Sequence, residues 1–183
     1  WFKKPNKILN NSNPPFYKWF AGAETNTCFN AVDRHVEAGR GNCTALIFDS
    51  AMTGNKQAIT YKELQEKVAR FAGVLVKQKI NAGDRVIIYM PMVPEAVVAM
   101  LGCARVGAIH SVVFGGFAPQ ELATRIDDSG AKLLVTATCG LEPGRTVEYI
   151  PMVNEAIALA SHKVERVLLL QRDEHLVEPY PHR

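Results

Sequence analysis

Residues 109–117 near the middle of the sequence, Ile-His-Ser-Val-Val-Phe-Gly-Gly-Phe, constrain the fold more than any other stretch. The apolar, β-branched run predicts a strand buried on both faces, as is usual in a parallel sheet. Gly115 and Gly116 allow a turn with positive φ, or the close approach of another molecule to bare backbone. Pro119 suits the first position of a helix, where its missing N–H costs nothing.

This order of strand, glycine turn and helix has two interpretations. Backbone N–H groups gathered at the carboxyl end of a sheet form the usual ligand-binding feature of open α/β folds. A tight connection from a strand to a helix, with no ligand, produces the same pattern. The residues by themselves leave both interpretations open.

Strand and helix patterns alternate along the rest of the chain. The clearest helix opens with a capping box at Thr60 and Glu63 and has apolar residues at helical spacing up to Leu75. We expect strands at 44–49, 58–59, 85–89, 109–114, 132–136 and 166–170, and helices at 28–35, 60–75, 94–104, 119–128 and 151–161. Such alternation implies right-handed βαβ units. The predicted fold class is α/β, a layered, mostly parallel sheet with helices on both faces.

The 183 residues are enough to bury a core and hold one domain or most of one. Residues 1–26 combine three prolines with six aromatic side chains, which predicts an extended arm packed on the domain or on a missing partner domain. The α/β unit is expected over residues 27–170, and the polar residues 171–183 are expected to be a frayed or truncated end. Because the chain begins with Trp1 and not Met, we expect a piece of a longer polypeptide.

Composition excludes several classes of function. The net charge of +3 is too small to favour nucleic acid as a partner. No apolar run approaches the roughly 18 residues of a membrane span. The four cysteines, Cys28, Cys43, Cys103 and Cys139, form no C-x-x-C pair and no metal-ligand spacing. Buried free thiols in a reducing compartment are therefore expected, without a disulfide framework or a metal site.

Residue patterns alone supply few candidates for chemistry. The usual dinucleotide, phosphate-loop, nucleophile-elbow and zinc-protease motifs are missing from the sequence. Arg145, in a loop expected at 139–146, has the setting of a phosphate clamp, although a solvated loop charge explains it equally well. His110 is either a ligand-facing group or a hydrogen-bonded core histidine. Asp127 and Asp128 point about 100° apart on a helix and indicate a charged C-terminal turn.

Several long motifs occur in an order that is specific to one family. They are Trp-Phe at 19–20 with Asp-Arg-His at 33–35, Tyr-Lys-Glu-Leu at 61–64, the segments 84–95 and 107–117, and Arg-Ile-Asp-Asp at 125–128. From residue 16 to residue 170 the chain resembles the N-terminal part of the short-chain acyl-CoA synthetases, the acetyl-CoA and propionyl-CoA synthetases of the adenylate-forming superfamily. The segment 142–149 is more similar to the propionyl-CoA synthetase branch.

The resemblance implies the N-terminal portion of the large domain of an ATP-dependent, AMP-forming ligase. A short carboxylate, propionate in preference to acetate, attacks the α-phosphate of ATP bound with magnesium and gives an acyl-adenylate and pyrophosphate. The thiol of coenzyme A then displaces AMP. The implied cofactors are ATP, magnesium and coenzyme A.

The same resemblance assigns cofactor-binding residues. Phe114, Gly115 and Gly116 are implied to lie against the nucleotide of coenzyme A, and Arg145 to contact its phosphates. Glu142 stands where the acetate enzyme has a second loop arginine, so it brings the opposite charge to the phosphate-binding loop. No residue of this chain is implied to be catalytic or to bind a metal.

The family's later motifs have no counterpart in these residues. They are the Ser/Thr/Gly-rich phosphate loop, the adenine-binding segment, the hinge acid and the C-terminal lysine. We therefore expect the isolated chain to be inactive, and the ATP and magnesium sites to lie in the rest of the parent enzyme. The alternative is a non-catalytic module for coenzyme A or nucleotide binding, or for scaffolding. The bacterial cytoplasm and the mitochondrial matrix both fit the free thiols.

Overall fold

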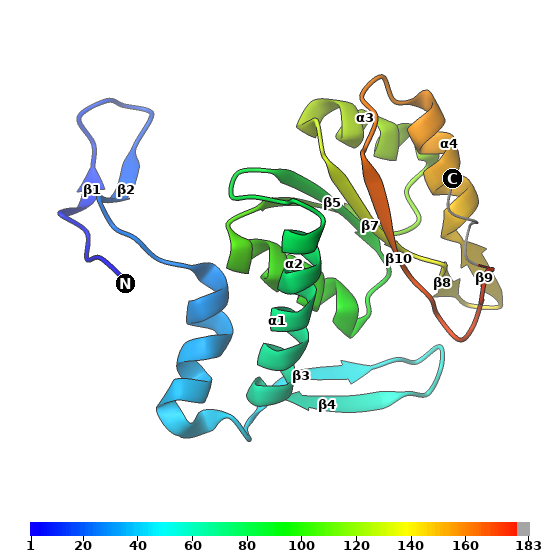
Figure 1. Cartoon of the computed structure of the whole chain (residues 1–183), viewed down its shortest axis with the longest axis horizontal. Helices are drawn as coiled ribbons and strands as arrows, with labels where there is room; N and C mark the ends of the chain where they lie inside the picture. The colour runs from blue at the N-terminus through cyan, green and yellow to red at the C-terminus, as the bar shows by residue number, and fades with distance from the viewer. Residues whose placement is uncertain (179–183) are drawn as a thin grey trace.

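A four-stranded parallel sheet with the strand order β10-β7-β5-β6 forms the centre of the molecule (Figure 1). The computed structural model describes residues 1–178. The strands are β5 (Arg85–Met90), β6 (Ile109–Phe114), β7 (Leu133–Ala137) and β10 (Arg166–Leu170). All three strand pairings are parallel, which confirms the predicted sheet.

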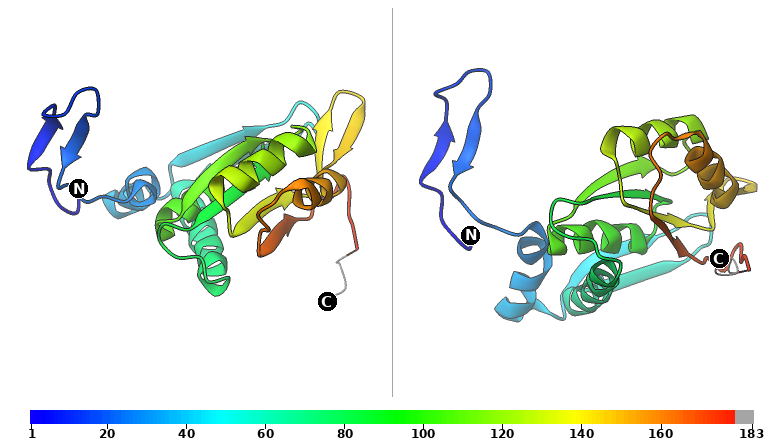
Figure 2. Two further views of the ribbon diagram at one scale, coloured as in Figure 1. Left: turned by 90° about the horizontal axis from the view of Figure 1, so that it is seen from above. Right: turned by 45° about the horizontal axis from the view of Figure 1, so that its top comes forward.

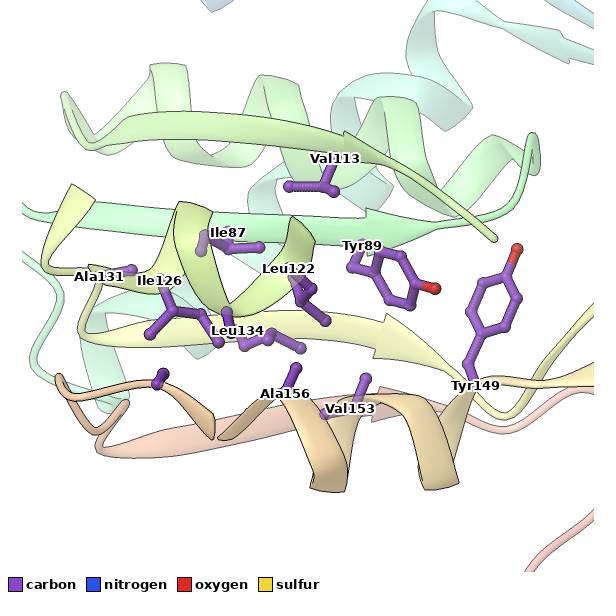
Figure 3. Close-up of a cluster of buried hydrophobic side chains, with 12 residues drawn as sticks. Ile87, Tyr89, Val113, Leu122, Ile126, Ala131, Leu134, Tyr149, Val153 and Ala156 are labelled. Carbon is purple, nitrogen blue, oxygen red and sulfur yellow. The ribbon is translucent and has the colours of Figure 1, made fainter. Parts of the chain in front are cut away.

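Helices cover both faces of the sheet, as predicted. Ile87 and Leu134 point toward α3 (Pro119–Ser129) and α4 (Tyr149–Leu159), where they share one core with Leu122 (Figure 3). The alternate residues of the same strands pack in a second core with α1 (Tyr61–Lys77) and α2 (Pro94–Val106). A strand covered on both sides needs an unbroken apolar run, and β5 has one.

The expectation that residues 109–114 are buried on both faces is wrong. β6 lies at the edge of the sheet within the described residues, and only Val113 is nearly covered, with 3% of its surface exposed. Ile109 is 57% exposed and Phe114 is 65% exposed. An apolar run identifies a strand, but the order of strands in space decides whether that strand has one neighbour or two.

The four cysteines form no disulfide within the described residues. Cys28, Cys103 and Cys139 are buried as expected, whereas Cys43 is exposed. No helix of residues 1–178 is both long enough and apolar enough to cross a bilayer.

The first part of the chain forms a hairpin that stands away from the sheet (Figures 1 and 2). Its strands are β1 (Lys7–Asn10) and β2 (Lys18–Ala21), which pair antiparallel. Six aromatic side chains, expected to pack on the domain or on a missing partner domain, are exposed: Trp1, Phe2, Phe16, Tyr17, Trp19 and Phe20. A ring contact of 5.0 Å between Phe2 and Phe29 links this segment to the helical turns that follow.

Those helical turns span residues 27–40 and include the wide turns η1 (Phe29–Asp33) and η2 (Val36–Arg40). A second antiparallel hairpin, β3 (Thr44–Asp49) and β4 (Lys56–Thr60), leads into α1. The predicted capping box is present, because Thr60 accepts from the Glu63 amide and Glu63 accepts from the Thr60 amide at 2.8 Å.

The loop expected at residues 139–146 is instead part of a third hairpin. Its strands are β8 (Cys139–Glu142) and β9 (Arg145–Glu148), joined at Pro143 and Gly144. Only those two residues form the turn, and the flanking residues pair as strands.

The end expected to be frayed is attached to the body at Arg172, which donates from its backbone amide to Thr138 and from its guanidinium to the Cys139 carbonyl. Residues 179–183 of that expected segment lie outside the described residues.

Two helical glycines give a matched test of the packing between α1 and α2. A Cβ on Gly102 would lie 2.5 Å from a ring carbon of Phe71, whereas a Cβ on Gly73 would meet nothing within 4 Å. We expect Gly102→Ala to destabilise the fold by about 1–3 kcal/mol through overpacking. Gly73→Ala should stabilise it by about 0.5–1 kcal/mol through the higher helix propensity of alanine. Urea unfolding measures both, and equal stabilisation by the two substitutions would contradict the packing described.

Candidate functional site

The carboxyl ends of β5 and β6 meet the hairpin β8–β9 around a cavity of about 200 Å³. The residues that line it are Met90, Pro91, Met92, Val112, Val113, Phe114, Gly115, Gly140, Leu141, Glu142, Val147 and Tyr149. One wall is the glycine turn after β6, and the other wall is the hairpin. The cavity lies at the carboxyl ends of the strands, which is where open α/β folds bind ligands.

Three of the five predicted site residues line this cavity: Phe114, Gly115 and Glu142. Gly116 is the next residue of the turn and has a φ of 105°. Arg145 does not line the cavity but pairs with Glu142 across the tip of the hairpin. The structure therefore places the two predicted segments, far apart in sequence, at one rim.

The glycine turn is closed by backbone and side-chain hydrogen bonds. The Phe117 amide donates to the Phe114 carbonyl at 3.2 Å, and their rings lie 5.7 Å apart. The Gly116 amide donates to the Tyr89 hydroxyl at 3.2 Å. A Cβ on Gly116 would meet nothing within 4 Å, so the backbone at Gly116 is open to close approach by a ligand. The side-chain space of Gly115 is instead filled by the Tyr149 hydroxyl and the Met90 carbonyl.

Arg145 is exposed, but it is not a free charge. Its Nη2 lies 2.6 Å from Glu142 Oε2, and its Nε donates to the same oxygen at 2.8 Å. The two side chains are 69% and 47% exposed. An ion pair this exposed contributes about 0.2–1 kcal/mol, so a phosphate can compete with Glu142 for the guanidinium.

His110 matches neither expectation. His110 is exposed on the edge strand β6, so it is not a core histidine, and it does not line the cavity at the carboxyl end of that strand.

The predicted charged turn at the end of α3 has a structural role, because Asp127 accepts from the backbone amides of Ser161 and His162. These two bonds lower the pKa of Asp127. Among residues 1–178, no three His, Cys, Asp or Glu side chains are grouped to hold a metal ion.

Sequence reasoning missed two residues of the site, Tyr89 and Tyr149. They come from β5 and from the start of α4, and their rings lie 5.0 Å apart (Figure 3). Burial raises the pKa of Tyr149 to about 12, and the neighbouring Tyr89 adds to the shift. Burial also raises the pKa of Tyr89, opposed by the hydrogen bond from Gly116. The available signal was the pair of glycines at 115 and 140, which leave room for a large side chain.

Comparison with known proteins identifies the family. The family model described as AMP-binding enzyme matches residues 32–182, most of the chain. This chain belongs to the AMP-binding enzyme family. The model described as acetyl-coenzyme A synthetase N-terminus matches residues 1–31.

Curated relatives of this chain confirm the resemblance found in the sequence. It is 52% identical over 172 residues to the mitochondrial acyl-CoA synthetase short-chain family member 3 of Bos taurus, covering 94% of this chain and 25% of the relative. It is 47% identical over 172 residues to the acetyl-coenzyme A synthetase of Streptomyces coelicolor, covering 94% and 26%. It is 48% identical over 184 residues to that of Methylobacillus flagellatus, covering 100% and 28%. The chain thus spans about a quarter of the length of these relatives.

The buried tyrosine makes folding sensitive to alkaline pH. The folded pKa of Tyr149, about 12, lies above the usual value of 10.0, so the folded state binds the phenolic proton more tightly than the unfolded state does. This contribution to the free energy of unfolding is complete below pH 10 and is lost as the pH rises toward 12. Urea unfolding of wild type and Tyr149→Phe over this range should show a smaller alkaline loss in the variant. Tyr17→Phe, in the exposed arm, is the control, and an equal loss in all three proteins would contradict the assignment.

Proposed function

We propose that this chain is the N-terminal part of an ATP-dependent, AMP-forming ligase that joins a short carboxylate, propionate in preference to acetate, to coenzyme A through an acyl-adenylate. Membership of the AMP-binding enzyme family and the names of the curated relatives support this class. The propionate preference is supported by the similarity of residues 142–149 to the propionyl-CoA synthetase branch. The observation that carries the proposal is the meeting of the Phe114-Gly115-Gly116 turn with the Glu142–Arg145 hairpin around one cavity.

In this proposal the chain supplies part of the coenzyme A edge of the site and no catalytic residue. The nucleotide of coenzyme A lies against Phe114, Gly115 and Gly116, and Arg145 binds its phosphates after leaving Glu142. The cavity of about 200 Å³ suits only a portion of such a ligand, because pockets for whole drug-sized ligands measure about 300–1,000 Å³. ATP and magnesium bind outside this chain, in the rest of the parent enzyme.

The division of the chain belongs to the same proposal. Residues 1–26 form an arm, residues 27–170 form the α/β unit, and residues 171–183 form the end segment. The partners are small-molecule substrates and the rest of the parent enzyme, with neither nucleic acid nor membrane. The compartment is the bacterial cytoplasm or the mitochondrial matrix, in keeping with relatives from bacteria and others that are named mitochondrial.

The isolated chain should form no acyl-CoA. The adenylation motifs of the family have no counterpart in its sequence, so neither step of the reaction can proceed on it alone. Incubation with propionate, ATP, magnesium and coenzyme A, followed by detection of propionyl-CoA and AMP, tests this. Measurable turnover would contradict the assignment of catalysis to the rest of the parent enzyme. The non-catalytic alternative is tested by the gene, because a stop codon directly after Arg183 would favour it.

Opposite changes at the hairpin test the phosphate clamp. We expect Arg145→Ala to weaken coenzyme A binding to the chain about tenfold, since a hydrogen bond from a charged donor contributes about 1.5–3 kcal/mol. Glu142→Gln should strengthen binding, because it removes the carboxylate that competes for the guanidinium. Isothermal titration calorimetry measures both changes. Arg70→Ala is the matched control, because this 81% exposed guanidinium also pairs with a glutamate, Glu66, but lies on α1 and not on the hairpin β8–β9. Equal affinities for Arg145→Ala and Arg70→Ala would rule out the clamp.

A further inference from the structure

Two buried tyrosines lie behind the cavity: Tyr89 contacts the glycine turn, and Tyr149 lies against both the turn and the hairpin. Tyr89 belongs to β5, one of the two inner strands of the sheet, and Tyr149 is the first residue of α4. Their exposed fractions are 0% and 3%, and their rings are tilted by 38°. Figure 3 shows the hydroxyl of Tyr149 pointing toward the segment that follows β6. Two residues 60 positions apart in sequence thus form one support beneath the glycine turn.

The hydroxyl of Tyr89 binds the backbone of the turn in two places. It donates to the Phe117 carbonyl at 2.9 Å and accepts from the Gly116 amide at 3.2 Å. The turn residues 115–118 lie between β6 and α3 and have no regular secondary structure of their own. Tyr89 therefore fixes the position of the turn backbone relative to β5.

The phenol of Tyr149 fills the space between the turn and the hairpin. A Cβ on Gly140 would lie 2.5 Å from Tyr149 Oη and 2.8 Å from its Cζ. A Cβ on Gly115 would clash with the same hydroxyl and lie 2.7 Å from the Met90 carbonyl oxygen. Gly115 belongs to the turn and Gly140 to β8, so one ring separates the two walls.

The site contains two kinds of glycine. Gly115 and Gly140 have no positive φ, and they are glycine because Tyr149 occupies the side-chain space. Gly116 and Gly144 have φ values of 105° and 77°, and a Cβ on either would meet nothing within 4 Å. Those two are required by the backbone conformation instead.

We propose that Tyr89 and Tyr149 are positioning residues for coenzyme A. Tyr89 sets where the backbone of the turn lies, and Tyr149 sets the distance between the turn and the hairpin that carries Arg145. A ligand that touches both walls needs this separation, and a displacement of about 1 Å is enough to weaken such contacts severely. The identity of the ligand rests on the proposed function, whereas the positioning itself rests on the contacts above.

Three substitutions and one control test this role by calorimetry with coenzyme A. Tyr89→Phe removes the hydroxyl that binds the turn and should weaken binding about tenfold. Tyr149→Leu removes the ring between the walls and should weaken binding at least as much, while Tyr149→Phe keeps the ring and should stay within about threefold of wild type. Val153→Ala is the control, because it opens a cavity in the same core without lining the ligand cavity.

A measurement without ligand separates this inference from the proposed function. Hydrogen exchange of the Gly116 amide, followed by NMR, should become faster in Tyr89→Phe and remain slow in Val153→Ala. Unchanged exchange in Tyr89→Phe would overturn the positioning role, as would equal loss of affinity in Tyr149→Leu and Val153→Ala at equal stability. If wild type fails to bind coenzyme A, the proposed site fails, and the exchange rates alone decide whether the tyrosines position the turn.

Discussion

The burial of β5 on both faces is the constraint on which the rest of the structure depends. Residues 86–89 have no exposed surface, and alternate side chains enter two different cores. Ile87 and Tyr89 pack under α3 and α4, while Val86 and Ile88 pack under α1 and α2. Because side chains alternate along a strand, one apolar run of five residues, 86–90, holds two helical layers together.

The same strand also builds the candidate site, so the core and the ligand edge share residues. Tyr89 is the last residue that β5 contributes to the core under α3 and α4, and its hydroxyl forms hydrogen bonds with the glycine turn. Met90 follows it and lines the cavity. A phenol suits this place, since its ring can be buried while its hydroxyl reaches polar backbone beyond the end of the sheet.

The rim attracts a phosphate less strongly than an unpaired arginine would. Arg145 is held by Glu142, and both side chains are largely in contact with solvent. Solvent screening keeps such a pair weak, so it limits the attraction for phosphate without blocking it. The residues that decide affinity at this rim are therefore expected to be those that set the geometry of its two walls, as much as the charge at its tip.

Local chemistry made much of the fold predictable. The capping box at Thr60 and Glu63, with the helical spacing that follows, predicted α1. The apolar runs predicted the strands of the parallel sheet. Both signals depend on residues that are close together in sequence. The motifs at 107–117 likewise gave the family, and the turn residues Phe114 and Gly115 do line the cavity. The hairpin at 139–148 was not predicted, because its turn-forming residues indicated a loop and hid the fact that residues 139–142 pair with residues 145–148.

The sequence by itself determined the α/β class, the family and the segments that form the rim. Only the tertiary structure decided that β6 is an edge strand, that Glu142 pairs with Arg145, and that Tyr149 lies between Gly115 and Gly140. The physical reason is that strand order and the packing of one ring against two distant glycines depend on which elements meet in space. Patterns among neighbouring residues in the sequence do not specify these long-range contacts.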